Sequence, residues 1–189
     1  MGEIRKIVVP VKLFCGLIVT DRSMLSVVKE NLSNIFGSID AVSDELSFTH
    51  THYYGNEMGK NLVRKWISFH DLISPEQLAH IKITTNEIER QYADFIRNGH
   101  GRDVIKRKAN IDPGYIGYSK VVLATTKDYD HRLYLHDGIF AEVTLHYKRA
   151  AKCFQPWPWT YPDYREKTAL DFFNTVREIY RSQVREECP

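Results

Sequence analysis

The clearest pattern of alternating hydrophobic and polar residues lies between residues 119 and 147. Asp137-Gly138 is a hairpin turn signal between two alternating runs. The preceding run at 121–124 is apolar without alternation, which is typical of a strand that is covered on both faces. The stretch therefore predicts a three-stranded antiparallel meander.

Two registers are compatible with the hairpin of this stretch. A two-residue loop would set Leu133 opposite Glu142 and place a carboxylate on the apolar face. A three-residue loop over residues 136–138, closed by a left-handed glycine, sets Arg132 opposite Glu142 instead. We favour the three-residue loop because it keeps one face apolar. That face then carries Leu133, Leu135, Ile139, Ala141 and Val143, and the other carries Arg132, Tyr134, Phe140, Glu142 and Thr144.

The rest of the chain alternates predicted helices and strands. Asp21 can cap a first helix, and Ser74-Pro75-Glu76-Gln77 has the form of a capping box that opens a second. Asp163 is expected to cap a last helix. Residues 112–115, Asp-Pro-Gly-Tyr, predict a turn. Further strands are predicted at Val11–Thr20, Ile39–Phe48, Leu62–Phe69 and Val104–Ile111.

The order of these elements predicts the fold class. It indicates an α+β protein with a mainly antiparallel sheet and a ferredoxin-like β-α-β-β-α-β core. The meander and a C-terminal helix would extend this core. We expect a single domain over residues 1–189, with two layers: helices on one face of the sheet, and a polar second face.

Composition narrows the class of protein. Hydrophobic residues make up 43% and charged residues 26% of the chain, as in ordinary globular proteins. A net charge of +2 gives no strong nucleic-acid signal. The longest apolar run is too short to cross a membrane, and no secretory signal is recognised. Three cysteines without a CxxC pair favour free thiols and a cytoplasmic location.

The polar face of the predicted sheet is the candidate site. Glu142 is expected in a strand, where glutamate is disfavoured, and can act as a general base or metal ligand. Asp112 is the second candidate catalytic residue, although an aspartate in this context is more often a turn former. The mixture of carboxylates, cations and tyrosines suits a phosphorylated small molecule or a nucleotide. The candidate ligand-binding residues are Tyr53, Tyr54, Glu57, Tyr115, Lys120 and Arg132.

Two other functions stay open at this point. His50-x-His52 on an extended segment would present both imidazoles on one face and, with Glu57, could bind a divalent metal ion. The chain would then be a metal-dependent hydrolase, although a solvated loop explains the same residues. A non-catalytic assembly module, which includes a homo-oligomer, is the third possibility. Whether the protein is an enzyme is left open.

Residues 55–61 do not match the sequence pattern of a phosphate-binding P-loop. The P-loop pattern GxxxxGK[ST] uses backbone amides to surround phosphates and a hydroxyl to reach magnesium. The segment Gly55–Asn61 is one residue short of this pattern and ends in asparagine. The sequence therefore argues against an ordinary P-loop GTPase, while a different kind of nucleotide site remains open.

Several motifs taken together resemble one bacterial and archaeal family, the domain of unknown function 4416. The resemblance extends from about Val11 to near the last helix. It implies little about activity, although some members are labelled GTP-binding, and the family pattern has an acid where this chain has His52. The motifs are TxYYxxEMG at 51–59, DPGY at 112–115, VLATTKD at 122–128, HRxYL at 131–135, GIxAExTL at 138–145 and WTYPDY at 159–164.

Overall fold

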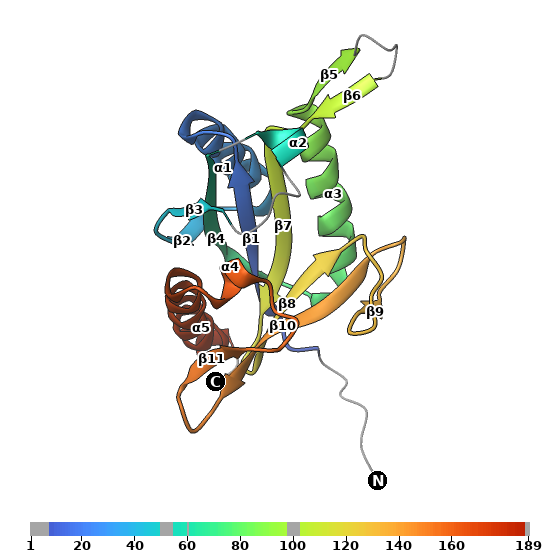
Figure 1. Ribbon diagram of the computed structural model, residues 1–189. Coiled ribbons are helices and arrows are strands. Elements are labelled where there is room, and N and C mark those ends of the chain that lie inside the picture. The colour runs from blue at the N-terminus through green and yellow to red at the C-terminus, as the bar shows by residue number, and fades with distance from the viewer. Residues whose placement is uncertain (1–7, 50–54, 60, 98–102, 188–189) are drawn as a thin grey trace.

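A computed structural model describes residues 8–49, 55–59, 61–97 and 103–187, and these are built around one large antiparallel sheet (Figure 1). Within these ranges, nine strands join in the order β11-β10-β8-β7-β1-β4-β2, with β3 paired to β4 and β9 to β10. The predicted α+β class with an antiparallel sheet is therefore confirmed. The strands are β1 (Val11–Val19), β2 (Ile39–Val42), β3 (Leu46–Phe48), β4 (Leu62–Ile73), β7 (Ala109–Ile116), β8 (Lys120–Thr125), β9 (Leu133–Tyr134), β10 (Phe140–Lys148) and β11 (Cys153–Pro156), and a separate hairpin pairs β5 (Asp94–Arg97) with β6 (Asp103–Lys106).

Helices cover both faces of the sheet, so the expected two-layer arrangement is wrong. Leu13 and Leu17 of β1 belong to the core beneath the first two long helices. Phe14 points to the opposite face, where its ring lies 4.9 Å from that of Phe173 in the last helix. The apolar stripe of the last helix is buried, so this helix packs on the face of the sheet opposite the first two long helices. The helices are α1 (Arg22–Phe36), α2 (Gly55–Met58), α3 (Leu78–Gln91), α4 (Pro162–Arg165) and α5 (Lys167–Glu187), with a 3₁₀ turn at Pro75–Gln77.

Two of the predicted helix starts are confirmed, and the third is wrong. The Asp21 carboxylate accepts a hydrogen bond of 2.9 Å from the Met24 amide. The capping box between Ser74 and Gln77 is present. Asp163 caps no helix: it lies inside α4, is buried, and pairs with Arg64. A charged partner on β4, which no local sequence rule can supply, decides the position of this carboxylate.

The hairpin register is confirmed, whereas the meander order is wrong. Tyr134 pairs with Phe140 and Leu133 with Ala141, which sets Arg132 opposite Glu142. However, β10 lies between β8 and β9, because β10 pairs directly with β8. The two-residue strand β9 is thus an edge strand, and Leu133 is 75% exposed instead of facing a helix.

The predicted turn at residues 112–115 is wrong, because these residues lie within β7. Strand β7 is paired with β1 along its whole length, but with β8 only over Gly114–Ile116. The sheet therefore splits between β7 and β8 beyond Gly114. A proline is tolerated at this point because Pro113 lies where β7 has no partner strand on its outer side.

Side chains of α3 take the place of the missing strand at the split. The Ile111 amide donates to Glu89 Oε1 at 2.7 Å, and the Ile111 carbonyl accepts from Lys82 Nζ at 2.9 Å. Buried backbone groups must be paired, so these two side chains stabilise the open edge of β7. They also bring charged groups through the gap to the face that carries α5.

Three smaller findings concern thiols and membranes. Cys15 is free and buried, and Cys153 is free and partly buried. Cys188 lies outside the described residues. None of the helices in the described part of the chain has the length and hydrophobicity that crossing a membrane requires.

Close packing at the end of the split gives a first prediction. A Cβ atom on Gly114 would lie 2.3 Å from the Val122 carbonyl oxygen and 2.5 Å from the Phe14 ring. Gly114→Ala should therefore lower the free energy of unfolding by about 1–3 kcal/mol or more, measured by urea denaturation. Gly117→Ala is the matched control, since its Cβ would meet only the Lys120 carbonyl at 4.0 Å. Equal stability of the two variants would contradict the packing at the split.

Candidate functional site

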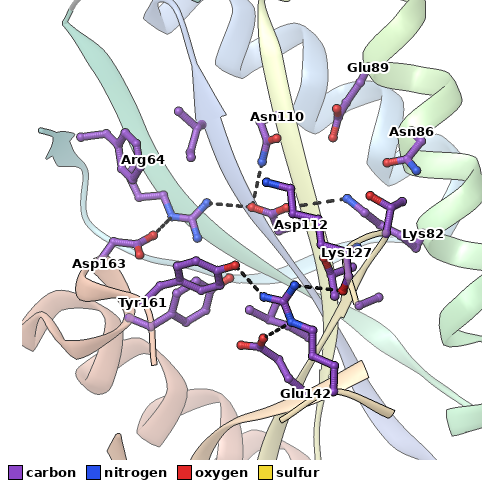
Figure 2. A pocket seen from close by; sticks show the side chains of 18 of the residues that line it. Arg64, Lys82, Asn86, Glu89, Asn110, Asp112, Lys127, Glu142, Tyr161 and Asp163 are labelled. Carbon is purple, nitrogen blue, oxygen red and sulfur yellow. Dashed lines mark hydrogen bonds and ion pairs between the residues drawn. The ribbon is translucent and has the colours of Figure 1, made fainter. Parts of the chain in front are cut away.

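A cavity of about 450 Å³ opens at the split in the sheet. Its walls come from β1, β3, β4, β7, β8, β10, α3 and α4, together with Arg107 and the loop that follows β8 (Figure 2). The volume lies within the range of small-molecule pockets, roughly 300–1,000 Å³. The lining combines apolar and polar side chains, and its charged groups are organised around two carboxylates, Asp112 and Glu142.

Asp112 is at the centre of the first group of charges. Its carboxylate lies 3.6 Å from Arg64 Nη1 and 3.6 Å from Lys82 Nζ, on either side of it in Figure 2. Asn110 Nδ2 donates to Asp112 Oδ2 at 2.8 Å. The three partners come from β4, α3 and β7, so packing of separate elements fixes their positions.

Arg64 is a buried cation held between aromatic rings. Its side chain is 1% exposed, and Nε lies 2.9 Å from Asp163 Oδ2. The guanidinium carbon lies 4.7 Å from the centroid of Trp66 and 5.0 Å from that of Tyr164, in cation–π contact. Gly16 makes room beneath it, because a Cβ there would lie 2.9 Å from Arg64 Nη2. The guanidinium is thus held rigidly at the cavity wall.

Glu142 is at the centre of the second group. Arg132 Nε donates to Glu142 Oε2 at 2.8 Å, and both side chains are almost completely buried. The same guanidinium donates to the Lys127 carbonyl at 3.0 Å and to Tyr161 Oη at 2.7 Å. Burial favours the neutral form of Arg132, but the hydrogen bonds and electrostatic interactions with Glu142 and Tyr161 together outweigh it and raise the pKa of Arg132 above its usual value. His131 Nε2 lies 3.3 Å from the Glu142 carboxylate.

Helix α3 contributes the third charged group. Lys82 and Glu89 are both buried, and Glu89 Oε2 lies 3.3 Å from Arg107. Burial raises the pKa of the Glu89 carboxyl, because a buried carboxylate loses its hydration. Arg107 also contacts Glu57 at 2.7 Å, which links α2 to the rim of the cavity.

The structure brings some of the predicted site residues together and separates others. Asp112, Arg132 and Glu142 line the same cavity, and Glu57 reaches its rim through Arg107. Tyr115 faces the α3 side of the sheet, where it packs against the core, and Lys120 is an exposed residue at the far end of β8. Neither Tyr115 nor Lys120 lines the cavity. His50, His52, Tyr53 and Tyr54 lie outside the described residues.

Sequence analysis missed several lining residues, of which Arg64, Lys82 and Glu89 matter most. A signal for the α3 pair exists: at helical spacing, Lys82 and Glu89 lie on the same face as Leu78 and Thr85, and all four are buried. Charged residues on a buried helix face require partners. This requirement is enough to identify Lys82 and Glu89 as candidate site residues. Leu62 and Trp66, two residues before and two residues after Arg64, are buried on β4. Arg64 therefore lies on a buried strand face and also requires a partner.

The metal site expected at His50, His52 and Glu57 cannot be traced, since both histidines lie outside the described residues. Within residues 8–49, 55–59, 61–97 and 103–187, no group of three or more His, Cys, Asp or Glu side chains is arranged to hold a metal ion. The Glu57 carboxylate is engaged by Arg107 through two nitrogens, each at 2.7 Å.

Breaking the buried Arg132–Glu142 pair should destabilise the fold. Arg132→Met leaves a buried carboxylate without its cation, a change that typically costs about 3–5 kcal/mol. We expect a loss of this size in the free energy of unfolding from urea denaturation. Arg22→Met is the matched control, because the Arg22–Glu45 pair is exposed and should contribute little. A similar small effect for both variants would contradict the buried pair.

The raised pKa of Glu89 predicts a pH dependence. The native carboxyl binds its proton more tightly than the unfolded one, whose pKa is about 4.3. Native stability is therefore lost as pH rises from about 4.3 through the higher native pKa. Glu89→Gln removes this titration, so thermal unfolding should show the variant gaining stability relative to wild type between pH 4 and pH 7. A difference that is constant with pH would refute the shift.

Comparison with known proteins gives one match. The family described as Domain of unknown function (DUF4416) matches residues 9–180. No curated protein and no solved structure matches the chain. Most of the motifs that carry the resemblance to this family lie on β7, β8, β10 and α4, which line the cavity. Since the match covers most of the 189 residues of the chain, the chain belongs to the DUF4416 family.

Proposed function

We propose that the protein binds a phosphorylated small molecule, such as a nucleotide, in the cavity at the split in the sheet. The observation that carries this proposal is the burial of its cations. Arg64, Lys82 and Arg132 are 1%, 6% and 7% exposed, yet all three line one open cavity. Burying a cation is costly, and three of them around a ligand-sized space suit an anion.

Lys82 has donor capacity for such an anion. Its ammonium has three N–H donors, and one of them is used by the Ile111 carbonyl at 2.9 Å. The 3.6 Å separation from Asp112 is longer than a hydrogen bond, so this contact is Coulombic. A phosphate oxygen beside Lys82 would accept a charge-assisted hydrogen bond, which is among the stronger polar contacts.

The carboxylates of the cavity act as counter-ions in this proposal. Asp112 faces Arg64 and Lys82, and its side chain is 29% exposed, so a ligand can reach it. An arriving phosphate would share these cations with Asp112, while Glu142 stays buried beneath Arg132. Asp112 and Glu142 are also the groups that we propose for acid–base chemistry, should the ligand be a substrate.

Two finer expectations remain proposals. The strand order β7-β1-β4-β2, with α1 and α3 on one face, supports a ferredoxin-like core. A cytoplasmic location agrees with the free thiols of Cys15 and Cys153. The hydrolase and assembly alternatives have less support. An anionic ligand would explain why cations are buried around the cavity, and neither alternative does.

A thermal-shift screen against nucleotides and sugar phosphates tests the proposal. A ligand at about 100 times its Kd stabilises the native state by about 2.7 kcal/mol, so at least one phosphorylated compound should raise the melting temperature measurably. Lys82→Met should abolish the shift relative to its own ligand-free melting temperature. Lys167→Met is the control, because Lys167 is 87% exposed on α5 and is not among the residues that line the cavity. No shift with any phosphorylated compound would reject the proposal.

A further inference from the structure

The two ends of the cavity differ in chemistry. At the Asp112 end, Arg64 and Lys82 contact the carboxylate at 3.6 Å, and the carboxylate is partly exposed. At the Glu142 end, the Arg132 guanidinium is held by three hydrogen bonds. Arg64 is also paired, with Asp163 at 2.9 Å. The cation that the first end offers to an incoming anion is therefore Lys82, which uses one of its three N–H donors on the Ile111 carbonyl.

Aromatic rings gather at the Glu142 end. Tyr129 lines the cavity and is 57% exposed, and the Arg132 guanidinium carbon lies 4.6 Å from its ring centroid. The ring of His131 is parallel to that of Tyr129 within 5° at 6.1 Å, and it stacks in turn on Trp159 at 5.5 Å. Tyr161, also on the cavity wall, is fixed by its hydrogen bond with Arg132. The rings are therefore held in place before any ligand binds.

Resting on the function proposed above, we infer that the ligand is a nucleoside monophosphate, with its phosphate beside Lys82 and Arg64 and its base against Tyr129 and Tyr161. Exposed aromatic rings on the wall of a polar cavity are suited to stacking on a base, which every nucleobase can do through its π face. The reverse orientation would place the phosphate against Arg132, whose guanidinium already donates to Glu142, to the Lys127 carbonyl and to Tyr161, and away from the N–H donors of Lys82.

The charge of the lining favours one phosphate over a chain of them. A phosphate monoester carries about −1.5 to −2 charges at neutral pH, and each further phosphate adds more. Basic side chains outnumber acidic ones in the lining by only one, so a triphosphate would bring an excess of negative charge into the cavity. The basic residues are Arg64, Lys82, Arg107, Lys127 and Arg132, and the acidic residues are Glu89, Asp112, Glu142 and Asp163.

Isothermal titration calorimetry of the wild-type protein tests the inference with ligand fragments. The probes are the four common nucleoside 5′-monophosphates, their nucleosides, their 5′-triphosphates and ribose 5-phosphate, without divalent metal. We expect at least one monophosphate to bind about tenfold or more tightly than its nucleoside and than ribose 5-phosphate. A triphosphate that binds more tightly than its monophosphate would overturn the inference.

Two variants then assign the ends. Tyr129→Leu changes an exposed ring and should weaken the monophosphate by about fivefold or more, while ribose 5-phosphate binding stays unchanged. Lys82→Met should weaken the monophosphate and ribose 5-phosphate alike; should this variant not fold, the wild-type fragment series and Tyr129→Leu decide. Equal losses for both probes with Tyr129→Leu, or none, would refute the orientation. Binding of sugar phosphates as tight as that of nucleotides would refute the inference and leave the proposed function intact, whereas no binding of any phosphorylated probe would reject both.

Discussion

Among the described residues, no strand pairs with Ile111 on the side of β7 away from β1, and two charged side chains of α3 bond its backbone instead. Glu89 accepts from its amide at 2.7 Å and Lys82 donates to its carbonyl at 2.9 Å. Because an unpaired buried backbone group is costly, these two bonds allow β7 and β8 to separate without loss of the sheet. The split they permit is the origin of the cavity.

The charged side chains that are buried at the split determine which other charged residues the site requires. Lys82 and Glu89 must be buried to reach Ile111, and buried charges require partners. Asp112 and Arg107 provide them, and Arg64 extends the same network to Asp163 on α4. On the other side of the gap, Arg132 and Glu142 neutralise each other. The site therefore consists of two groups of paired charges that line one cavity, and we propose that a ligand enters it as an additional partner.

The sequence predicts the features that depend on neighbouring residues, but not those that depend on residues far apart in the chain. Local rules predicted the Asp21 cap, the Ser74 capping box and the register that pairs Arg132 with Glu142, because each depends on neighbouring residues. The Asp112–Tyr115 turn was wrong because Pro113 and Gly114 serve a sheet edge and a close contact with Phe14, which depend on distant strands. The cavity cations Arg64 and Lys82 were missed because their partners are far away in sequence.

A crystal structure of the protein grown with nucleoside 5′-monophosphates would test the central claim most directly. The account predicts density for a phosphate within about 3 Å of Lys82 Nζ, in the cavity between Asp112 and Arg132, with β7 and β8 still separated beyond Gly114. A ligand bound at another surface, or a sheet in which β8 pairs with β7 along its full length and closes the cavity, would contradict it.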